Sequence, residues 1–118
     1  MPWLVRDGKV LATLEVAETI RERTHGLLGR DGIDGAVLLR PARSVHTFRM
    51  RFSIDVAFID GDLRVIRMLT MPPNRITLPV WRARAVVEAE AGAFGTWGLK
   101  LSDQLEVRGG DGDDGEHA

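Results

Sequence analysis

The chain has 118 residues, of which 44% are hydrophobic and 28% are charged, and it contains no cysteine. This length suits one globular domain and is too short for two ordinary ones, and the lack of cysteine excludes disulfides, thiolate catalysis and cysteine-ligated metals. The net charge is −1, but four of the 17 acidic residues lie in the last eight residues. The rest of the chain has 13 acidic and 16 basic residues, a net charge of +3. This charge is too small to indicate a nucleic-acid surface.

The sequence gives no sign of membrane insertion or secretion. No apolar run approaches the ~20 residues that a membrane span requires. Charges at Arg6, Asp7 and Lys9 fall where a signal peptide needs its apolar core. We therefore expect a soluble protein that works in the cytoplasm without membrane attachment. A signal peptide that was cleaved from the N-terminus is left open as an alternative.

The N-terminal third predicts a hairpin followed by a helix. Strands are expected over residues 3–6 and 9–16, joined at Asp7-Gly8, because this dipeptide favours a type I′ hairpin turn. The capping-box pattern TIRE at 19–22 is followed by apolar residues at helical spacing. It predicts one short amphipathic helix over residues 19–28, which the glycines that follow would end.

The rest of the chain predicts short strands separated by turns. They are expected over residues 36–39, 45–50, 53–59, 63–71, 85–90 and 104–108, with a second hairpin turn at 60–62, a loop over 74–81 and a turn or short helical piece around 92–98. This order predicts a mostly β (α+β) fold, a small rolled sheet or barrel of six or seven largely antiparallel strands with one short helix. We expect a single domain over 1–109 and a disordered acidic tail over 110–118.

The segment SVHTFRMRFSIDVAFID, residues 44–60, concentrates polar side chains among apolar ones. Alternation along the strand places Asp55 on a face shared with Ala57 and Ile59, while the intervening residues form the other face. A buried carboxylate needs hydrogen bonds or a cation, and the nearest donors lie in residues 46–51. We therefore predict that Asp55 is partly or wholly buried and accepts hydrogen bonds from that segment. The ligand-binding candidates are His46, Thr47, Arg49, Arg51 and Asp55.

Four separated motifs resemble one known family. They are RERTHGLLGR at 21–30, SVHTFRMRF with IDVAFID over 44–60, VVEAEAG at 86–92 and GLKLSD at 98–103. Together they resemble domain of unknown function 192 (DUF192), a family of bacteria and archaea, over about residues 10–107. Arg49 and Ser102 stand where the family has glycine, and Ser53 where it has proline, which predicts altered turns at the two serines and a changed charge at Arg49. The resemblance implies a compact, mostly β single domain and supplies no reaction.

Three functions stay open. The favoured one is a binding or accessory domain with a polar pocket for a small anionic ligand. The second is a small enzyme that uses His46 and Asp55 as an acid–base pair, although no nucleophile elbow is present. The third is a protein-interaction module, which an exposed apolar patch on the loop 74–81 would favour.

Two further residues are secondary candidates for the site. Arg23 is a candidate ion-pair partner for Asp55, and Glu88, which interrupts an apolar strand, is expected to pair with an arginine. Glu88 and Asp103 are interpreted as positioning residues. No histidine spacing typical of a metal site is present, and no metal or cofactor is expected.

Overall fold

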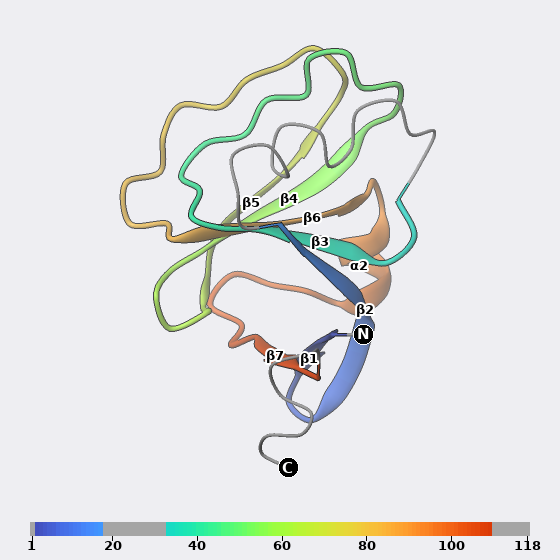
Figure 1. Cartoon of the computed structure of the whole chain (residues 1–118), viewed down its shortest axis with the longest axis vertical. Coiled ribbons are helices and arrows are strands. Elements are labelled where there is room, and N and C mark those ends of the chain that lie inside the picture. The colour runs from blue at the N-terminus through green and yellow to red at the C-terminus, as the bar shows by residue number, and fades with distance from the viewer. Residues whose placement is uncertain (1, 18–32, 110–118) are drawn as a thin grey trace.

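The computed structural model describes residues 2–17 and 33–109 (Figure 1). Within these ranges, seven strands form one mixed sheet in the order β5-β4-β6-β3-β2-β1-β7, accompanied by one short helix. The elements are β1 (Trp3–Arg6), β2 (Lys9–Ala17), β3 (Ala36–Leu39), β4 (Ile54–Ile59), β5 (Val65–Met71), β6 (Ala85–Glu90), α2 (Ala93–Trp97) and β7 (Glu106–Arg108). The predicted mostly β fold is confirmed. No helix in this part of the chain is long and apolar enough to cross a membrane.

Both predicted hairpin turns are confirmed. Asp7 and Gly8 have φ values of 53° and 77°, the left-handed conformation that a type I′ turn requires at both central positions. At the turn between β4 and β5, the Asp60 carboxylate accepts hydrogen bonds from the N–H groups of Asp62 (2.9 Å) and Arg64 (3.0 Å). The bond from Arg64 does most to hold the pKa of Asp60 below its usual value.

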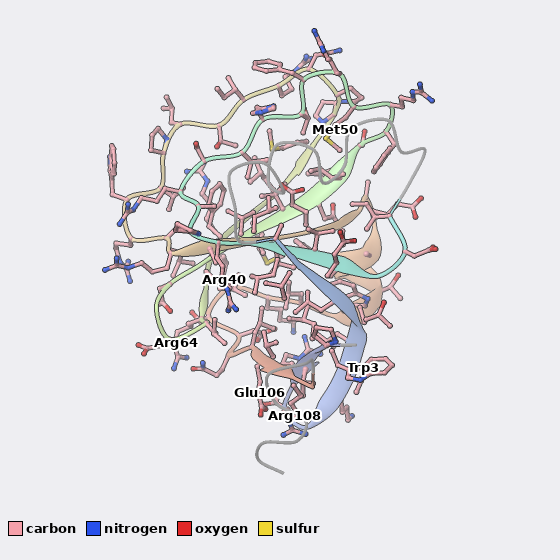
Figure 2. The ribbon with its side chains drawn as sticks, in the orientation of Figure 1. Trp3, Arg40, Met50, Arg64, Glu106 and Arg108 are labelled. Carbon is pink, nitrogen blue, oxygen red and sulfur yellow. The ribbon has the colours of Figure 1, made fainter. Side chains whose placement is uncertain are left out.

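The sheet rolls so that one end of β5 meets the segment that follows α2. Val65 N–H donates to the Asp103 carbonyl at 2.9 Å, and Leu105 N–H donates to the Leu63 carbonyl at 2.9 Å. The guanidinium of Arg64, labelled in Figure 2, adds a bond to the Ser102 carbonyl at 3.1 Å. These contacts close the sheet at the beginning of β5 and leave residues 66–71 outside the closure.

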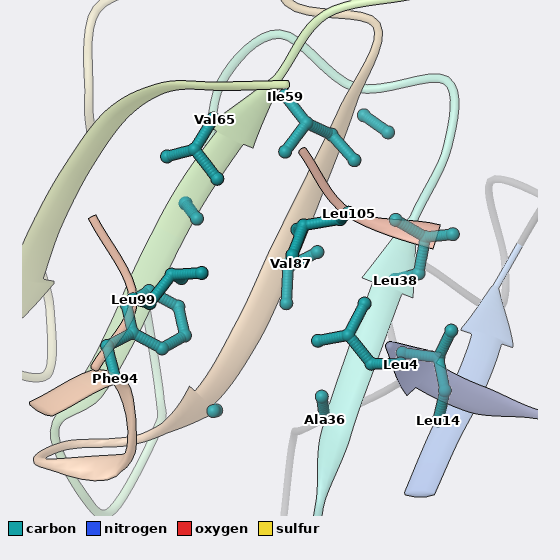
Figure 3. Close-up of a cluster of buried hydrophobic side chains, with 13 residues drawn as sticks. Leu4, Leu14, Ala36, Leu38, Ile59, Val65, Val87, Phe94, Leu99 and Leu105 are labelled. Atoms are coloured by element: carbon teal, nitrogen blue, oxygen red, sulfur yellow. The ribbon is translucent and has the colours of Figure 1, made fainter. Parts of the chain in front are cut away.

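The sheet separates two apolar cores. The helix-side core, shown in Figure 3, is built around Leu4, Leu14, Leu38, Ile59, Val87 and Phe94. The loop-side core on the other face contains Val37, Val45, Met50, Ile54, Val56, Phe58 and Val86. The predicted alternation along β4 is confirmed, since Ala57 and Ile59 belong to the helix-side core and Val56 and Phe58 to the loop-side core.

One predicted strand is wrong. Residues 45–50 form a loop, in which only His46 makes an isolated bridge, to Ile76. Arg49 has a φ of 67°, a left-handed conformation that ends extended structure. Ser102 has a φ of 72°, so both residues that replace a family glycine have a backbone conformation that glycine adopts readily. The predicted helix over 19–28 and the predicted tail over 110–118 lie outside the described residues.

Candidate functional site

Asp55 is buried, as predicted, with 5% of its surface exposed. Its Oδ1 accepts a hydrogen bond from the Thr70 hydroxyl at 2.7 Å, and its Oδ2 accepts from the N–H groups of Gly92 (3.0 Å) and Phe94 (3.1 Å) at the start of α2. The predicted donors in residues 46–51 are therefore wrong. The reason is the face of the sheet: Asp55 points to the helix side, where Thr70 lies directly opposite it on β5, whereas residues 45–50 pack on the loop side.

Thr47 is fully buried and holds two loops together. Its hydroxyl donates to the Pro72 carbonyl at 2.7 Å and accepts from Arg75 N–H at 2.9 Å. Its own N–H donates to the Arg75 carbonyl at 2.8 Å, and its carbonyl accepts from Asn74 N–H at 2.8 Å. These contacts use the polar groups of Thr47 within the protein, so its role is structural.

Further bonds extend this attachment along both loops. Thr77 N–H donates to the Val45 carbonyl at 2.9 Å, and Val80 N–H donates to the Arg43 carbonyl at 2.7 Å. Arg49 N–H donates to Oδ1 of Asn74 at 3.1 Å. We call residues 43–50 and 72–81 the stapled loops; they run side by side at the top of Figure 1.

His46 lies on the stapled loops with its ring exposed. The ring stacks on Phe48 with centroids 5.0 Å apart, and its Nδ1 accepts from Phe48 N–H at 3.4 Å. Asp55 is bonded on the other face of the sheet, so the structure does not join His46 and Asp55 as an acid–base pair. Arg49 and Arg51 are also exposed, and Arg23 lies outside the described residues.

The stapled loops carry an exposed apolar patch, which we define as Ile76, Leu78 and Trp81. Their exposed fractions are 66%, 85% and 75%. The first two also border a groove of about 480 Å³ between β5 and residues 72–79. Its other lining residues include Arg67, Leu69, Met71 and Arg75. The sequence reasoning missed this groove; the signal available was the alternation of residues 67, 69 and 71 on one face of a strand that turns at Pro72 into a loop with apolar residues.

Arginines lie beside this patch: Arg67 and Arg75 line the same groove, and Arg43 Nε donates to the Trp81 carbonyl at 3.1 Å. Residues 40–54 contain four arginines and residues 63–87 contain five, and neither segment contains an aspartate or a glutamate. Within residues 2–17 and 33–109, no three histidine, aspartate or glutamate side chains gather closely enough to hold a metal ion. The arrangement is suited to binding carboxylates or phosphates through guanidinium groups.

Glu88 is buried in β6 with 4% of its surface exposed. Its register neighbours are Val37 on β3 and Val56 on β4, and burial raises the pKa of its carboxyl to about 8. The arginine partner expected for it is not found in the described part of the chain. Within the described residues the expectation fails, because a central strand places position 88 among valines, whereas every described arginine except the part-buried Arg6 of β1 is exposed.

The chain matches the model of the DUF192 family, described as uncharacterised, over residues 3–107. A UPF0127 protein of Pyrococcus horikoshii is 33% identical over 97 residues, which cover 75% of this chain and 84% of the relative. A UPF0127 protein of Pyrococcus abyssi is 29% identical over 105 residues, which cover 85% of this chain and 86% of the relative.

Two solved structures share the fold. A protein of unknown function from Novosphingobium aromaticivorans has a TM-score of 0.73 at 18% identity, over 89% of this chain and 82% of the other. A protein from Sinorhizobium meliloti, provisionally named a transcription regulator, has a TM-score of 0.76 at 21% identity, over 90% of this chain and 91% of the other. At these identities the likeness extends to the fold alone.

Proposed function

The chain belongs to the DUF192 family, whose description names no activity, and we propose that it is a binding domain that receives an acidic, partly apolar protein partner on its stapled loops. The observation that carries this proposal is the apolar patch of Ile76, Leu78 and Trp81, which is exposed beside the three arginines Arg43, Arg67 and Arg75. Large apolar side chains that gather on a surface with a polar rim are typical of protein-interaction sites. An exposed patch on this loop was the feature expected of an interaction module.

The hydrogen bonds between the stapled loops support the proposal. A binding surface on free loops would lose conformational entropy when its partner ordered it. Here Thr47 connects the two loops through both its hydroxyl and its backbone, and Thr77 connects them again. The patch is therefore presented by a backbone that is already fixed, which lowers the cost of association.

The charge of the surface favours an acidic partner. Arg43, Arg67 and Arg75 lie beside the patch and its groove, and their positive charge attracts carboxylates and repels basic proteins. The same charge supports a second candidate, the small anionic ligand. Of the residues predicted for its pocket, His46, Arg49 and Arg51 are exposed, whereas Thr47 and Asp55 are buried on opposite sides of the sheet.

A peptide selection tests the proposal. Random peptides displayed on phage are selected against the immobilised protein, and we expect the enriched peptides to combine glutamate or aspartate with apolar residues. The variant Ile76→Ser with Leu78→Ser should lose at least about tenfold in affinity for the enriched peptides. The matched control replaces Val10 and Leu101, which are 57% and 61% exposed away from the stapled loops, and should bind normally.

Two outcomes would count against the proposal. Enriched peptides without acidic residues, or with equal affinity for both double variants, would show that the stapled loops are not the binding surface. Release of every acidic peptide by millimolar inorganic phosphate, with phosphate binding unaffected by the loss of Ile76 and Leu78, would favour the small anionic ligand instead.

A further inference from the structure

The edge of β5 is only partly paired. On one side β5 pairs with β4 along its length, and on the other side Leu63 and Val65 bond to the segment after α2. Residues 66–71 make no backbone hydrogen bond on that second side to any other described residue. Backbone groups along an open strand edge form a ready template for another strand.

Grooves lie on both faces of this open edge. The first is the groove beside the stapled loops, which Arg67, Leu69 and Met71 line from the loop-side face. The second, of about 370 Å³, lies on the helix-side face and is lined by Asp55, Met68, Thr70, Phe94 and Leu99. Successive side chains of an added strand point to opposite faces. An added strand would therefore place alternate side chains in the two grooves.

The two grooves differ in the side chains that they would accept. Arg67 and Arg75 are among the residues that line the loop-side groove, and none of its lining residues carries a carboxylate. The helix-side groove is mostly apolar, and the carboxylate of Asp55 already accepts three hydrogen bonds there. A strand with acidic residues toward the first groove and apolar residues toward the second would match both.

The same features disfavour a second copy of this chain as the added strand. The register between β4 and β5 shifts at Phe58/Ile59, an irregularity of the kind that natural edges use against self-pairing. The side chain of Arg67 is exposed beside it and makes no hydrogen bond or ion pair with another described residue. Two such edges would bring like charges together, whereas an acidic segment would be attracted.

We propose that residues 66–71 of β5 receive an extended acidic segment of a partner protein as an added β-strand, with alternate apolar and acidic side chains in the two grooves. This inference rests on the proposed function, because it names the form in which the acidic partner binds. The main chain of the partner then bonds to β5, and the apolar patch contacts the flanking part of the partner.

The test uses a synthetic peptide of alternating glutamate and valine, long enough to cover residues 66–71, with an alternating lysine–valine peptide as its control. We expect the glutamate peptide to bind at least about tenfold more tightly and to slow amide hydrogen exchange in residues 66–71. Arg67→Glu should reverse the preference, whereas Arg84→Glu, at an exposed arginine that borders neither groove, should not.

Backbone N-methylation of the peptide separates strand addition from other binding modes. In an added strand, every second residue directs its N–H group toward β5, and the residues between them direct theirs toward solvent. Methylation of the first set removes the donors that bond β5, whereas methylation of the second set leaves these donors in place. We expect one set to weaken binding at least about tenfold and the other by less than about twofold. This comparison needs no variant of the protein.

The possible failures are distinguishable. If both methylated peptides bind as tightly as the parent, strand addition is wrong while the acidic partner of the stapled loops remains supported. If neither the glutamate peptide nor any peptide selected on phage binds, both proposals fail. If the free protein dimerises through β5, shown by a dimer in sedimentation that Arg67→Glu changes, the edge serves self-association and the inference is overturned.

Discussion

Asp55 and Glu88 are two buried carboxyl groups on neighbouring strands, and they differ in almost everything else. Asp55 points to the helix side, where a hydroxyl and two backbone N–H groups bond its oxygens. Glu88 points to the loop side, and no described residue bonds it. Burial alone raises the pKa of Glu88 to about 8. Two equally buried carboxyl groups therefore differ in whether donors satisfy their oxygens.

The comparison also separates two roles. Asp55 attaches the start of α2 to β4 and β5, because one of its donors lies on β5 and two lie at the start of α2. Glu88 joins nothing in the described structure and is protonated at neutral pH, since its pKa of about 8 lies above 7. Replacing Asp55 should therefore lower the stability of the fold, and replacing Glu88 should not.

The largest expected effect is at Asp55. Asp55→Ala should lower the free energy of unfolding by about 3 kcal/mol or more, because it leaves the buried N–H of Phe94, the part-buried N–H of Gly92 and the Thr70 hydroxyl without their acceptor. Asp55→Asn should cost less, since the amide oxygen can accept from Gly92 and Phe94 while its NH2 donates to Thr70. Urea unfolding measures both. Losses below about 0.5 kcal/mol in both variants would remove the structural role assigned to Asp55.

The next effect is the pH dependence that Glu88 imposes. The pKa of Glu88 in the folded protein, about 8, lies above the usual 4.5. Its contribution to the free energy of unfolding is therefore fully present below pH 4.5 and is lost as the pH rises through about 8. Between these two pH values, Glu88 lowers the free energy of unfolding by about 1.4 kcal/mol per pH unit. Glu88→Gln should remove this pH dependence and gain up to about 3 kcal/mol at pH 7, which lies 2.5 units above 4.5.

Urea unfolding between pH 5 and 9 checks the Glu88 prediction, with the exposed Glu90→Gln on the same strand as the control. The control should follow the wild-type curve. If the Glu88→Gln curve runs parallel to that of the wild type, the carboxyl is ionised in the folded protein and the contrast with Asp55 disappears.

A smaller effect is expected from the hydroxyl that bonds Asp55. Thr70→Val keeps the shape of the side chain and removes the 2.7 Å bond to Oδ1, so it should cost about 1 to 1.5 kcal/mol. In the Asp55→Ala background the same change should cost little, because the partner is already absent. A double-mutant cycle measures the coupling, and additive losses would show that Thr70 acts independently of Asp55.

The smallest effect is at Asp103, a carboxylate that water still reaches. It accepts from Arg6 at 3.1 Å, and the side chains of Arg6 and Asp103 are 19% and 24% exposed. Asp103→Asn should cost at most about 1 kcal/mol, and 1 M salt should reduce that cost. Urea unfolding at low and high salt tests this. A loss as large as that of Asp55→Ala would mean that exposure does not weaken such a pair here.

The proposed binding surface was only partly predictable from the sequence. The stretch 44–60 was predicted to hold the site, and a strand was predicted at 45–50. The left-handed backbone of Arg49 and the bonds of Thr47 to Pro72 and Arg75 make residues 45–50 a loop instead. The groove beside β5 was missed because it forms between a strand and a loop whose packing no local pattern specifies.

The sequence by itself determined the features that depend on neighbouring residues. Asp7-Gly8 specified its turn, because few dipeptides adopt left-handed conformations at both positions. Period-two alternation along β4 specified which of its residues share a face, and hence that Asp55 is buried. Only the tertiary structure decided what meets Asp55, because two of its donors lie 37 and 39 residues later. The open edge of β5 has the same origin: pairing between distant segments depends on the register and roll of the whole sheet, which no short stretch of sequence encodes.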